Sequence, residues 1–357
     1  MKVYNASSFA EYVEAVSEIS AKASDSGIVW FRGISDWHFP LIPSLYREKK
    51  LFYHDPNSPN YTSVHYAEDM RTQHYIAKNY HFYDKLPTSR VEWLEVMQHH
   101  LVKTRVLDWS ESSIHSLLFA VEPFIDIKKY SVVARKHHVP CVWVLHPQKL
   151  NNKIIQYLLN DKNEAFAKKV MCSELKISSH EWMEIKHHMN SFEEIYTKSD
   201  GWSSMKHLNG IVNLSTINDE VLRDRSRLKE KLCNGEMLPI FYLLSRIYSD
   251  GFLLDKRELP PLAVVQSYHS ERIKAQKGVF AIFPVCRESV NDTALRNAGF
   301  DPNGMQNILA AADCMERIDL LQPGKIAKEL VRNGLRDSWL YPENPIVANE
   351  IETCNLI

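Results

Sequence analysis

The segment at residues 139–147, VPCVWVLHP, constrains the fold more than any other part of this sequence. Its β-branched and aromatic residues, bounded by prolines, are typical of a buried strand. Shorter segments of the same kind occur at 27–33 (GIVWFRG), at 260–265 (PPLAVV) and at 278–285. Strands near both ends of the chain, with helices between them, predict an α+β fold with a mixed or antiparallel sheet core.

Helices are predicted wherever apolar residues recur at helical spacing. The first covers 9–23, with Ser8 as its cap and Glu11 placed to support that cap. The region 151–258 is rich in charged, helix-favouring segments and is interpreted as a largely helical insertion. Gly334 is expected to end a helix. The remaining helices are predicted at 64–83, 91–100, 111–125, 305–320, 323–335 and 337–352.

Charge and cysteine content exclude some classes of protein. Lysine and arginine (43) nearly balance aspartate and glutamate (44), so no overall field attracts the chain to nucleic acid, although a local basic groove stays open. The six cysteines contain no C-x-x-C pair. The N-terminus lacks the pattern of a signal segment, and no apolar run approaches a membrane span. A cytoplasmic protein with free thiols, and no membrane partner, is therefore expected.

Arg32, in the sequence WFRG, stands at the end of a predicted strand and before a glycine. Arginine is rarely buried without a partner, so one interpretation is a structural ion pair. The other is anion recognition, because a guanidinium on a rigid strand binds phosphate or carboxylate with two hydrogen bonds. Gly33 would let backbone or ligand approach closely.

The densest group of polar residues is MQHHLVKTRVLDWSES at 97–112, interpreted as a helix end and the turn after it. Arg105 and Asp108 are spaced to pair on one helical turn. Alternatively, Asp108 orients Arg105 or Arg32 toward an anionic ligand, and Trp109 either stacks on a ring or lies in the core.

Metal and cysteine chemistry are not favoured. Adjacent histidines such as His99 and His100 point about 100° apart on a helix and do not easily share one ion. No cysteine stands in a recognisable catalytic pattern, and no carboxylate cluster with two-metal spacing suggests a nuclease. No metal cofactor is predicted.

Taken in order, WFRG, QHHLVKTRVLDWSESSIHSLLFAVE, VPCVWVLHPQKLN, SERIKAQKGVFAIFP and NGLRDSWLYPENPIVANEI resemble the FRG-domain family, named for a Phe/Tyr-Arg-Gly motif. The resemblance runs from about residue 28 to 350 and implies one domain over 1–357. The family usually has Gly-Leu-Pro where this chain has Leu101, Val102 and Lys103. The positions that the resemblance marks are Arg32, Gly33, Gln98, His99, Thr104, Arg105, Asp108, Trp109, Arg272, Gln276, Gly278 and Phe280.

WFRG also resembles, more weakly, the strand that opens the NAD site of arginine-type ADP-ribosyltransferases. That resemblance implies a fold of that type, with Arg32 holding the NAD phosphates. Those enzymes supply a glutamate from a late strand, where this chain offers Gln276 and, five residues earlier, Glu271. Gln276 can hydrogen-bond ribose but lacks a carboxylate's charge, so Asp108 or another carboxylate would have to supply it.

Two functional hypotheses follow from these resemblances. The first is an NAD-consuming ADP-ribosyltransferase, a toxin or phage-defence effector that modifies a nucleic acid or protein and is controlled by an antitoxin or chaperone. Arg32 and Gln276 would bind NAD, His99 or Asp108 would orient or deprotonate the acceptor, and Gln98, Thr104, Arg105 and Trp109 would complete the NAD site. On the aromatic loop after the first strand, Trp37, Phe39 and Tyr46 would stack on a base of the acceptor, and Arg47 would contact phosphate. The second is a non-catalytic nucleotide or nucleic-acid sensor.

Overall fold

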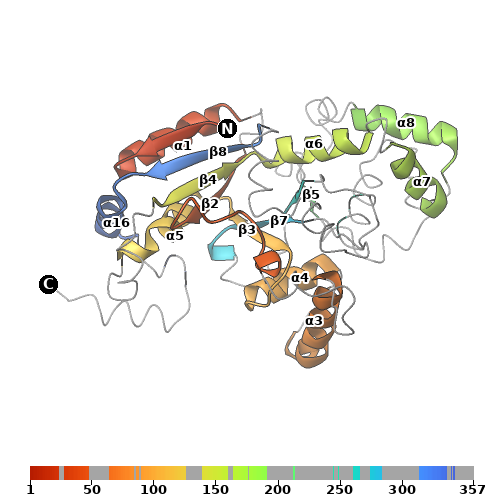
Figure 1. Cartoon of the computed structure of the whole chain (residues 1–357), viewed down its shortest axis with the longest axis horizontal. Coiled ribbons are helices and arrows are strands. Elements are labelled where there is room, and N and C mark those ends of the chain that lie inside the picture. The colour runs from red at the N-terminus through yellow and green to blue at the C-terminus, as the bar shows by residue number, and fades with distance from the viewer. Residues whose placement is uncertain are drawn as a thin grey trace, which may run out of the picture.

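An eight-stranded mixed sheet forms the centre of the protein in a computed structural model (Figure 1). The structure describes residues 1–23, 28–47, 64–83, 86–87, 90–125, 139–159, 164–175, 177–190, 212–213, 244, 248, 260–265, 274–283, 313–335, 339 and 341. The strand order is β1-β8-β4-β2-β3-β7-β6-β5. The strands are β1 (Val3–Ala6), β2 (Trp30–Ile34), β3 (Val106–Ser110), β4 (Cys141–Leu145), β5 (Val212–Asn213), β6 (Leu262–Val265), β7 (Gly278–Ile282) and β8 (Met315–Leu320).

Pairing within the sheet is strong except at its middle. β1 and β8 run parallel, as do β5 and β6, and the other neighbours are antiparallel. β4 pairs with both β2 and β8 over five residues, and β3 pairs with β7 over five. By contrast, β2 and β3 share one registered pair, Phe31 with Ser110. The two central strands therefore diverge, and the sheet splits between them.

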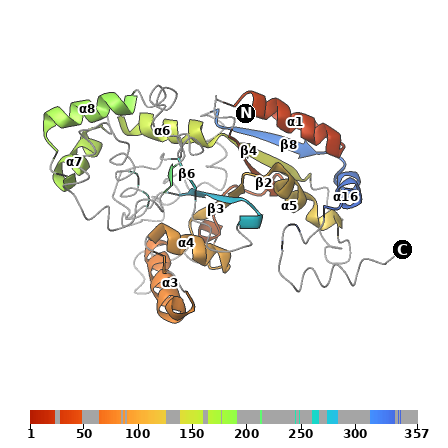
Figure 2. The ribbon, with the colours of Figure 1, turned by 180° about the vertical axis from the view of Figure 1, so that it is seen from behind.

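Three helices cover one face of the sheet. Ser8 caps the first of them, since its Oγ accepts a hydrogen bond from Glu11 N, as the sequence predicts. Gly334 follows the last of them at φ +78°, which confirms its expected role at a helix end. Buried residues of all three helices form one core with β2, β4 and β8. The helices are α1 (Phe9–Ala21), α5 (Ser113–Ile125) and α16 (Pro323–Arg332), which lie together in Figure 2.

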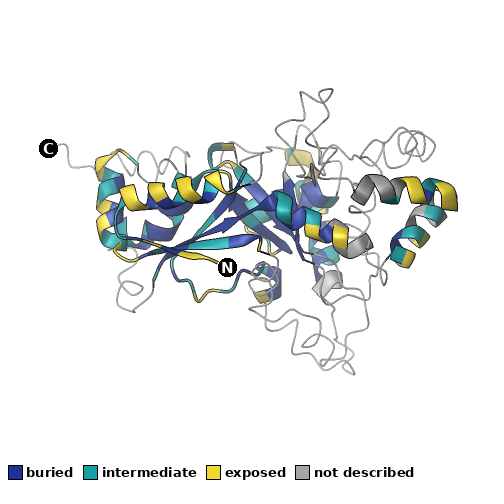
Figure 3. Cartoon of the chain, turned by 90° about the horizontal axis from the view of Figure 1, so that it is seen from above, coloured by how far each residue is buried: buried dark blue, intermediate teal, exposed yellow. Residues whose placement is uncertain are grey.

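The opposite face of the sheet is covered by the loop that follows β2 and by a helix after β4. The loop ends in the short 3₁₀ helix η1 (Leu45–Arg47), whose Leu45 and Tyr46 are buried against Trp30 and Trp143. The helix is α6 (Pro147–Leu159), which contributes Leu150. Figure 3 shows the strands largely buried between these layers. Because Trp30 and Arg32 alternate with Phe31, Arg32 lies on this face of the sheet.

Two helices lie together beyond β3, namely α3 (Val64–Asn79) and α4 (Arg90–His99), with the 3₁₀ helix η2 (Tyr80–Phe82) between them (Figures 1 and 2). Every residue of α4 from Val91 to Met97 is buried, including two glutamates. Glu95 Oε2 has no hydrogen-bond partner among the described residues. Burial, with Glu92 nearby, raises the pKa of Glu95 well above its usual range.

Glu95→Gln is therefore expected to stabilise the protein at pH 8 by about 1–3 kcal/mol, because glutamine has no proton to release on unfolding and each unit of raised pKa costs about 1.4 kcal/mol at high pH. Above the unfolded pKa of about 4.3, the folded state keeps a proton that the unfolded state releases, so stability falls as pH rises through the raised pKa. The gain should shrink toward pH 4. Melting temperatures across pH measure it, with exposed Glu14→Gln as the control. A gain that is the same at every pH contradicts the assignment.

Most predicted elements are confirmed, and three corrections concern strands. Residues 106–110 are strand β3, not a turn, and 315–320 are strand β8, not the end of a helix. The sequence reading also missed β1. In the predicted insertion, α6 is joined by α7 (Glu164–Leu175) and α8 (Ser179–Asn190), and the structure also places β5 there. The predicted helix at 337–352 lies almost entirely outside the described residues, as do residues 305–312.

The α+β class and the mixed sheet agree with the sequence prediction. Within the described part of the chain, no helix combines the length and apolar character needed to cross a membrane.

Candidate functional site

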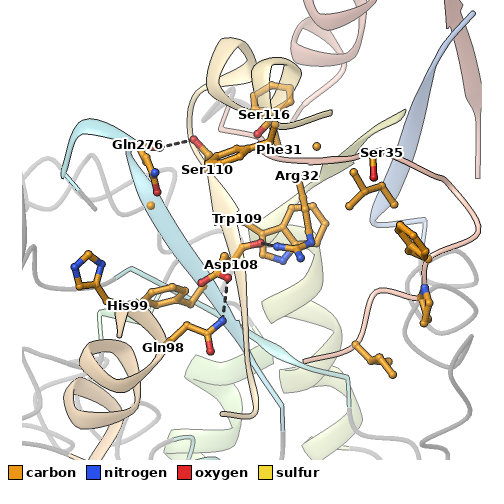
Figure 4. Close-up of a pocket in the computed structure, with 18 of the residues that line it drawn as sticks. Phe31, Arg32, Ser35, Gln98, His99, Asp108, Trp109, Ser110, Ser116 and Gln276 are labelled. Carbon is orange, nitrogen blue, oxygen red and sulfur yellow. Dashed lines mark hydrogen bonds between the residues drawn. The ribbon is translucent and has the colours of Figure 1, made fainter. Parts of the chain in front are cut away.

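A cavity of about 510 Å³ lies where β2 and β3 diverge (Figure 4). Its volume falls within the range of pockets that bind small molecules and cofactors. It is lined by parts of both half-sheets, by α4 and α5, and by the loop after β2. The lining residues are Phe31, Arg32, Gly33, Ile34, Ser35, Phe39, Pro40, Ile42, Arg47, Gln98, His99, Leu101, Asp108, Trp109, Ser110, Ser116, Phe119, Gln276, Gly278 and Phe280.

Arg32 reaches from β2 across the split toward β3, as Figure 4 shows. Its Nη1 donates a hydrogen bond to the Asp108 carbonyl oxygen at 2.6 Å. Its Nε is buried and has no hydrogen-bond partner among the described residues. Burial lowers the pKa of Arg32, and Arg47 lowers it further, while Asp108 opposes both effects. The positive charge of Arg32 is therefore only partly compensated by the protein.

Asp108 is held by a side chain from α4. Gln98 Nε2 donates to Asp108 Oδ2 at 2.9 Å, and Thr104 Oγ1 donates to Gln98 Oε1 at 2.7 Å. The carboxylate fixes which end of the amide faces Asp108, because its oxygen accepts and so requires the amide nitrogen; the amide oxygen is then left to accept from the threonine hydroxyl. The sequence interpretation grouped these residues but did not identify this relay.

Gly33 explains how β2 and α5 pack so closely. An added Cβ at this position would lie 1.7 Å from the Ser116 carbonyl oxygen. No side chain fits there unless the helix moves. Of the two roles considered for this glycine, close approach of backbone is the one that the geometry demonstrates.

Arg105 does not line the cavity. Its side chain is fully buried, and Nε donates to Glu68 Oε2 at 2.7 Å while its main-chain N donates to Glu68 Oε1 at 3.1 Å. Nη1 donates to the carbonyl oxygens of Phe283, at 2.8 Å, and Tyr248. The ion pair in the structure is thus with Glu68 rather than with Asp108. A buried arginine with these partners anchors the start of β3.

The aromatic residues divide into core and cavity residues. Trp109 is buried in the core that includes Trp30 and Trp143, although part of it also lines the cavity. Tyr46 is buried, and Trp37 stacks on His38 with ring centroids 3.8 Å apart. Of the four loop residues expected to contact a nucleic-acid acceptor, Phe39 and Arg47 line the cavity.

Gln276 and His99 both line the cavity. Gln276 lies in the turn before β7, and His99 is the last residue of α4. The Gln276 carbonyl oxygen accepts a hydrogen bond from Ser110 Oγ at 2.6 Å, which ties the turn before β7 to β3. Gly278 and Phe280 also line the cavity. Glu271 and Arg272 lie outside the described residues.

Most of the predicted site residues lie together around the cavity. Several other lining residues were not predicted from the sequence. Ser116 and Phe119 of α5 enter the cavity through the close packing at Gly33, which spacing along the sequence does not reveal. The alternation of Leu107 and Trp109 with Asp108 was the available signal for β3, and so for the position of Asp108.

The described residues were predicted to hold no metal site, and two of their cysteines are buried. The described part of the chain contains no group of three or more His, Cys, Asp or Glu side chains placed to hold an ion. Cys141 and Cys314 are buried in the core. Burial raises the pKa of both thiols, to about 11 for Cys314, so both are protonated at neutral pH.

The fold and the cavity define an α+β protein with a ligand-sized pocket at the split in its sheet. Residues 27–127 match the model of the FRG domain. The match includes Arg32, Gly33 and the segment from Gln98 to Trp109. No curated protein matches the chain, and no solved structure matches it.

Proposed function

We propose that the cavity binds NAD and that the protein is an ADP-ribosyltransferase. The observation that carries this proposal is the pair of arginines in the cavity. Arg32 and Arg47 both line it and lie close enough for Arg47 to lower the pKa of Arg32. Among the described residues, neither forms an ion pair within 4 Å, so two cationic groups face the cavity without a bound carboxylate. A pyrophosphate supplies the missing negative charge.

The remaining lining residues suit cleavage of the nicotinamide–ribose bond. In that reaction nicotinamide leaves with the bonding electron pair, and an acceptor atom forms the new bond to the ribose carbon and gives up its proton. Asp108 is the one carboxylate among the described lining residues. We assign it to the developing positive charge on the ribose. Gln276 would hydrogen-bond the ribose hydroxyls, and His99 would accept the proton of the acceptor.

We further propose a nucleic acid or protein as the acceptor, and a role as a toxin or phage-defence effector restrained by an antitoxin or chaperone. The aromatic loop after β2 supports a nucleic-acid acceptor, because its Trp37 ring is partly exposed and an aromatic ring stacks on a base. An FRG domain fits a defence-related protein.

The site also supports treating residues 1–357 as one functional unit with 151–258 as an insertion. The family match ends at residue 127, yet Gln276, Gly278 and Phe280 complete the cavity wall. β7, which carries two of these residues, pairs with β3 inside the matched region.

A non-catalytic nucleotide sensor is the second candidate, and Gln276 favours it. An amide at this position binds ribose without stabilising positive charge, and Asp108 Oδ2 already accepts a hydrogen bond from Gln98. Such a site would bind NAD without releasing nicotinamide.

Arg32→Ala is expected to weaken NAD binding by roughly 10- to 100-fold, because a charge-assisted hydrogen bond contributes about 1.5–3 kcal/mol. Calorimetric titration measures the affinity. Labelled NAD incubated with RNA, DNA and lysate detects transfer, and nicotinamide release detects hydrolysis. Arg332→Ala, an exposed arginine on α16, is the matched control.

The outcomes separate the candidates. Transfer of label that is lost in Arg32→Ala supports the transferase, whereas NAD binding without turnover supports the sensor. Wild-type protein that neither binds nor cleaves NAD refutes the proposal. If Arg32→Ala loses its circular-dichroism spectrum and cooperative melting, Arg32 belongs to the framework of the fold instead.

A further inference from the structure

Leu101 adopts a backbone conformation that leucine rarely takes. It follows α4 at φ +62°, in the left-handed region. Its N–H donates to the Gln98 carbonyl oxygen at 3.0 Å, and Val102 N–H donates to the Met97 carbonyl oxygen at 2.9 Å. These bonds end the helix with a turn in which glycine is the usual residue, because a Cβ is strained there.

Packing within the protein does not explain the choice of leucine. The Leu101 side chain is 88% exposed, so it buries almost no apolar surface in compensation for the strain. Strained residues persist mainly at sites where the side chain serves binding or catalysis. An exposed leucine in a strained conformation therefore calls for a contact outside the folded chain.

A ligand bound in the cavity would make this contact, because Leu101 lines the cavity together with Phe39. Phe39 belongs to the loop after β2, on a different element from Leu101, and its side chain is 53% exposed. The same cavity holds the two arginines. Its wall thus combines a cationic part, suited to phosphate, with two apolar side chains that phosphate would not require.

We infer that Leu101 and Phe39 are specificity-determining residues that hold the planar heteroaromatic ring of the nucleotide bound in the cavity. This inference rests on the proposed function, since it assigns the ring of the same ligand whose phosphates face Arg32 and Arg47. An aromatic face and a leucine side chain both pack on a flat ring, and each loses exposed apolar surface when they do.

The test is calorimetric titration of the full-length protein with two probes, NAD and inorganic pyrophosphate. Leu101→Ala removes most of the side chain and keeps a Cβ, whereas Leu101→Met keeps an apolar side chain of similar size. We expect Leu101→Ala and Phe39→Ala each to weaken NAD binding about tenfold, the effect of losing part of a buried apolar side chain. Leu101→Met should bind NAD within about threefold of wild type. Pyrophosphate binding should stay unchanged in all three variants.

Leu101→Gly provides a second test, in which NAD affinity and thermal stability should not fall together. It should weaken NAD binding as Leu101→Ala does, while its melting temperature stays at or above that of the wild type because the backbone strain is removed. A lower affinity in a protein that is at least as stable cannot arise from unfolding.

Each other outcome is informative. NAD binding by Leu101→Ala that equals wild type overturns the inference and leaves the proposed function intact. Equal losses for pyrophosphate and NAD also overturn it, since the effect would not depend on a ring. If wild-type protein binds pyrophosphate but not NAD, the site does not accept the nucleotide ring, and the inference is overturned. Wild-type protein that binds neither probe refutes the proposed function itself, and the inference with it.

Discussion

Glu68→Ala is expected to lower the free energy of unfolding by about 3–5 kcal/mol, because it leaves the buried charge of Arg105 without its partner. Glu68 Oε1 and Oε2 accept hydrogen bonds from Arg105 N and Nε, and both side chains are fully buried. Equilibrium unfolding in urea measures the change. The loss should be accompanied by weaker ligand binding, since Arg105 immediately precedes the strand that carries Asp108.

The neighbouring residue supplies the control. Asp69 pairs with Arg90, and both side chains are partly exposed. Asp69→Ala should cost less than about 1 kcal/mol, as is usual for pairs that solvent screens. If the two alanine variants prove equally stable, the buried pair does not anchor β3.

Gly33→Ala is expected to destabilise the protein by about 3 kcal/mol or more, because the new methyl group would overlap the Ser116 carbonyl oxygen at 1.7 Å. That oxygen belongs to the backbone of α5, so the whole helix has to shift. The shift displaces Ser116 and Phe119 from the cavity wall, and ligand binding should weaken along with stability.

Gly324→Ala is the matched control for this steric effect. Gly324 lies near the start of α16, and nothing lies within 4 Å of an added Cβ. Alanine favours a helix, so this variant should be as stable as wild type or more stable by up to about 1 kcal/mol. A Gly33→Ala protein that melts with the wild type would show that α5 moves without cost.

The two arginines that the sequence marks show why pattern alone could not assign roles. Arg32 and Arg105 both stand next to apolar residues of a strand, and the sequence predicts both to contact an anionic ligand. They differ in a carboxylate that lies 37 residues away in the chain, because Glu68 meets Arg105 only once α3 has packed beside β3. The polar and aromatic composition of 64–83 predicts α3, but it does not predict which of its two carboxylates, Glu68 or Asp69, is buried.

The strands show a similar division. β2, β4, β6 and β7 were predicted because their apolar residues stand in runs bounded by proline or glycine. β3 and β8 contain aspartate, glutamate or arginine among their apolar residues. The sequence therefore predicts a turn in place of β3 and the end of a helix in place of β8. In both strands a polar residue is held by a partner on another element, as with Asp108 of β3, which accepts a hydrogen bond from Gln98, and Glu316 of β8, whose Oε2 lies 3.2 Å from His146 Nε2. Long-range partners of this kind leave little trace in local sequence.

The single registered pair between β2 and β3 has a consequence for how the protein unfolds. One half-sheet contains β1, β8, β4 and β2, and the other contains β3, β7, β6 and β5. A nucleotide that contacts Arg32 on one side and Asp108 on the other acts as a non-covalent cross-link between the halves. Ligand at one hundred times its dissociation constant adds about 2.7 kcal/mol to stability. Amide hydrogen exchange in β2 and β3 should slow most on binding, since these two strands share one registered pair.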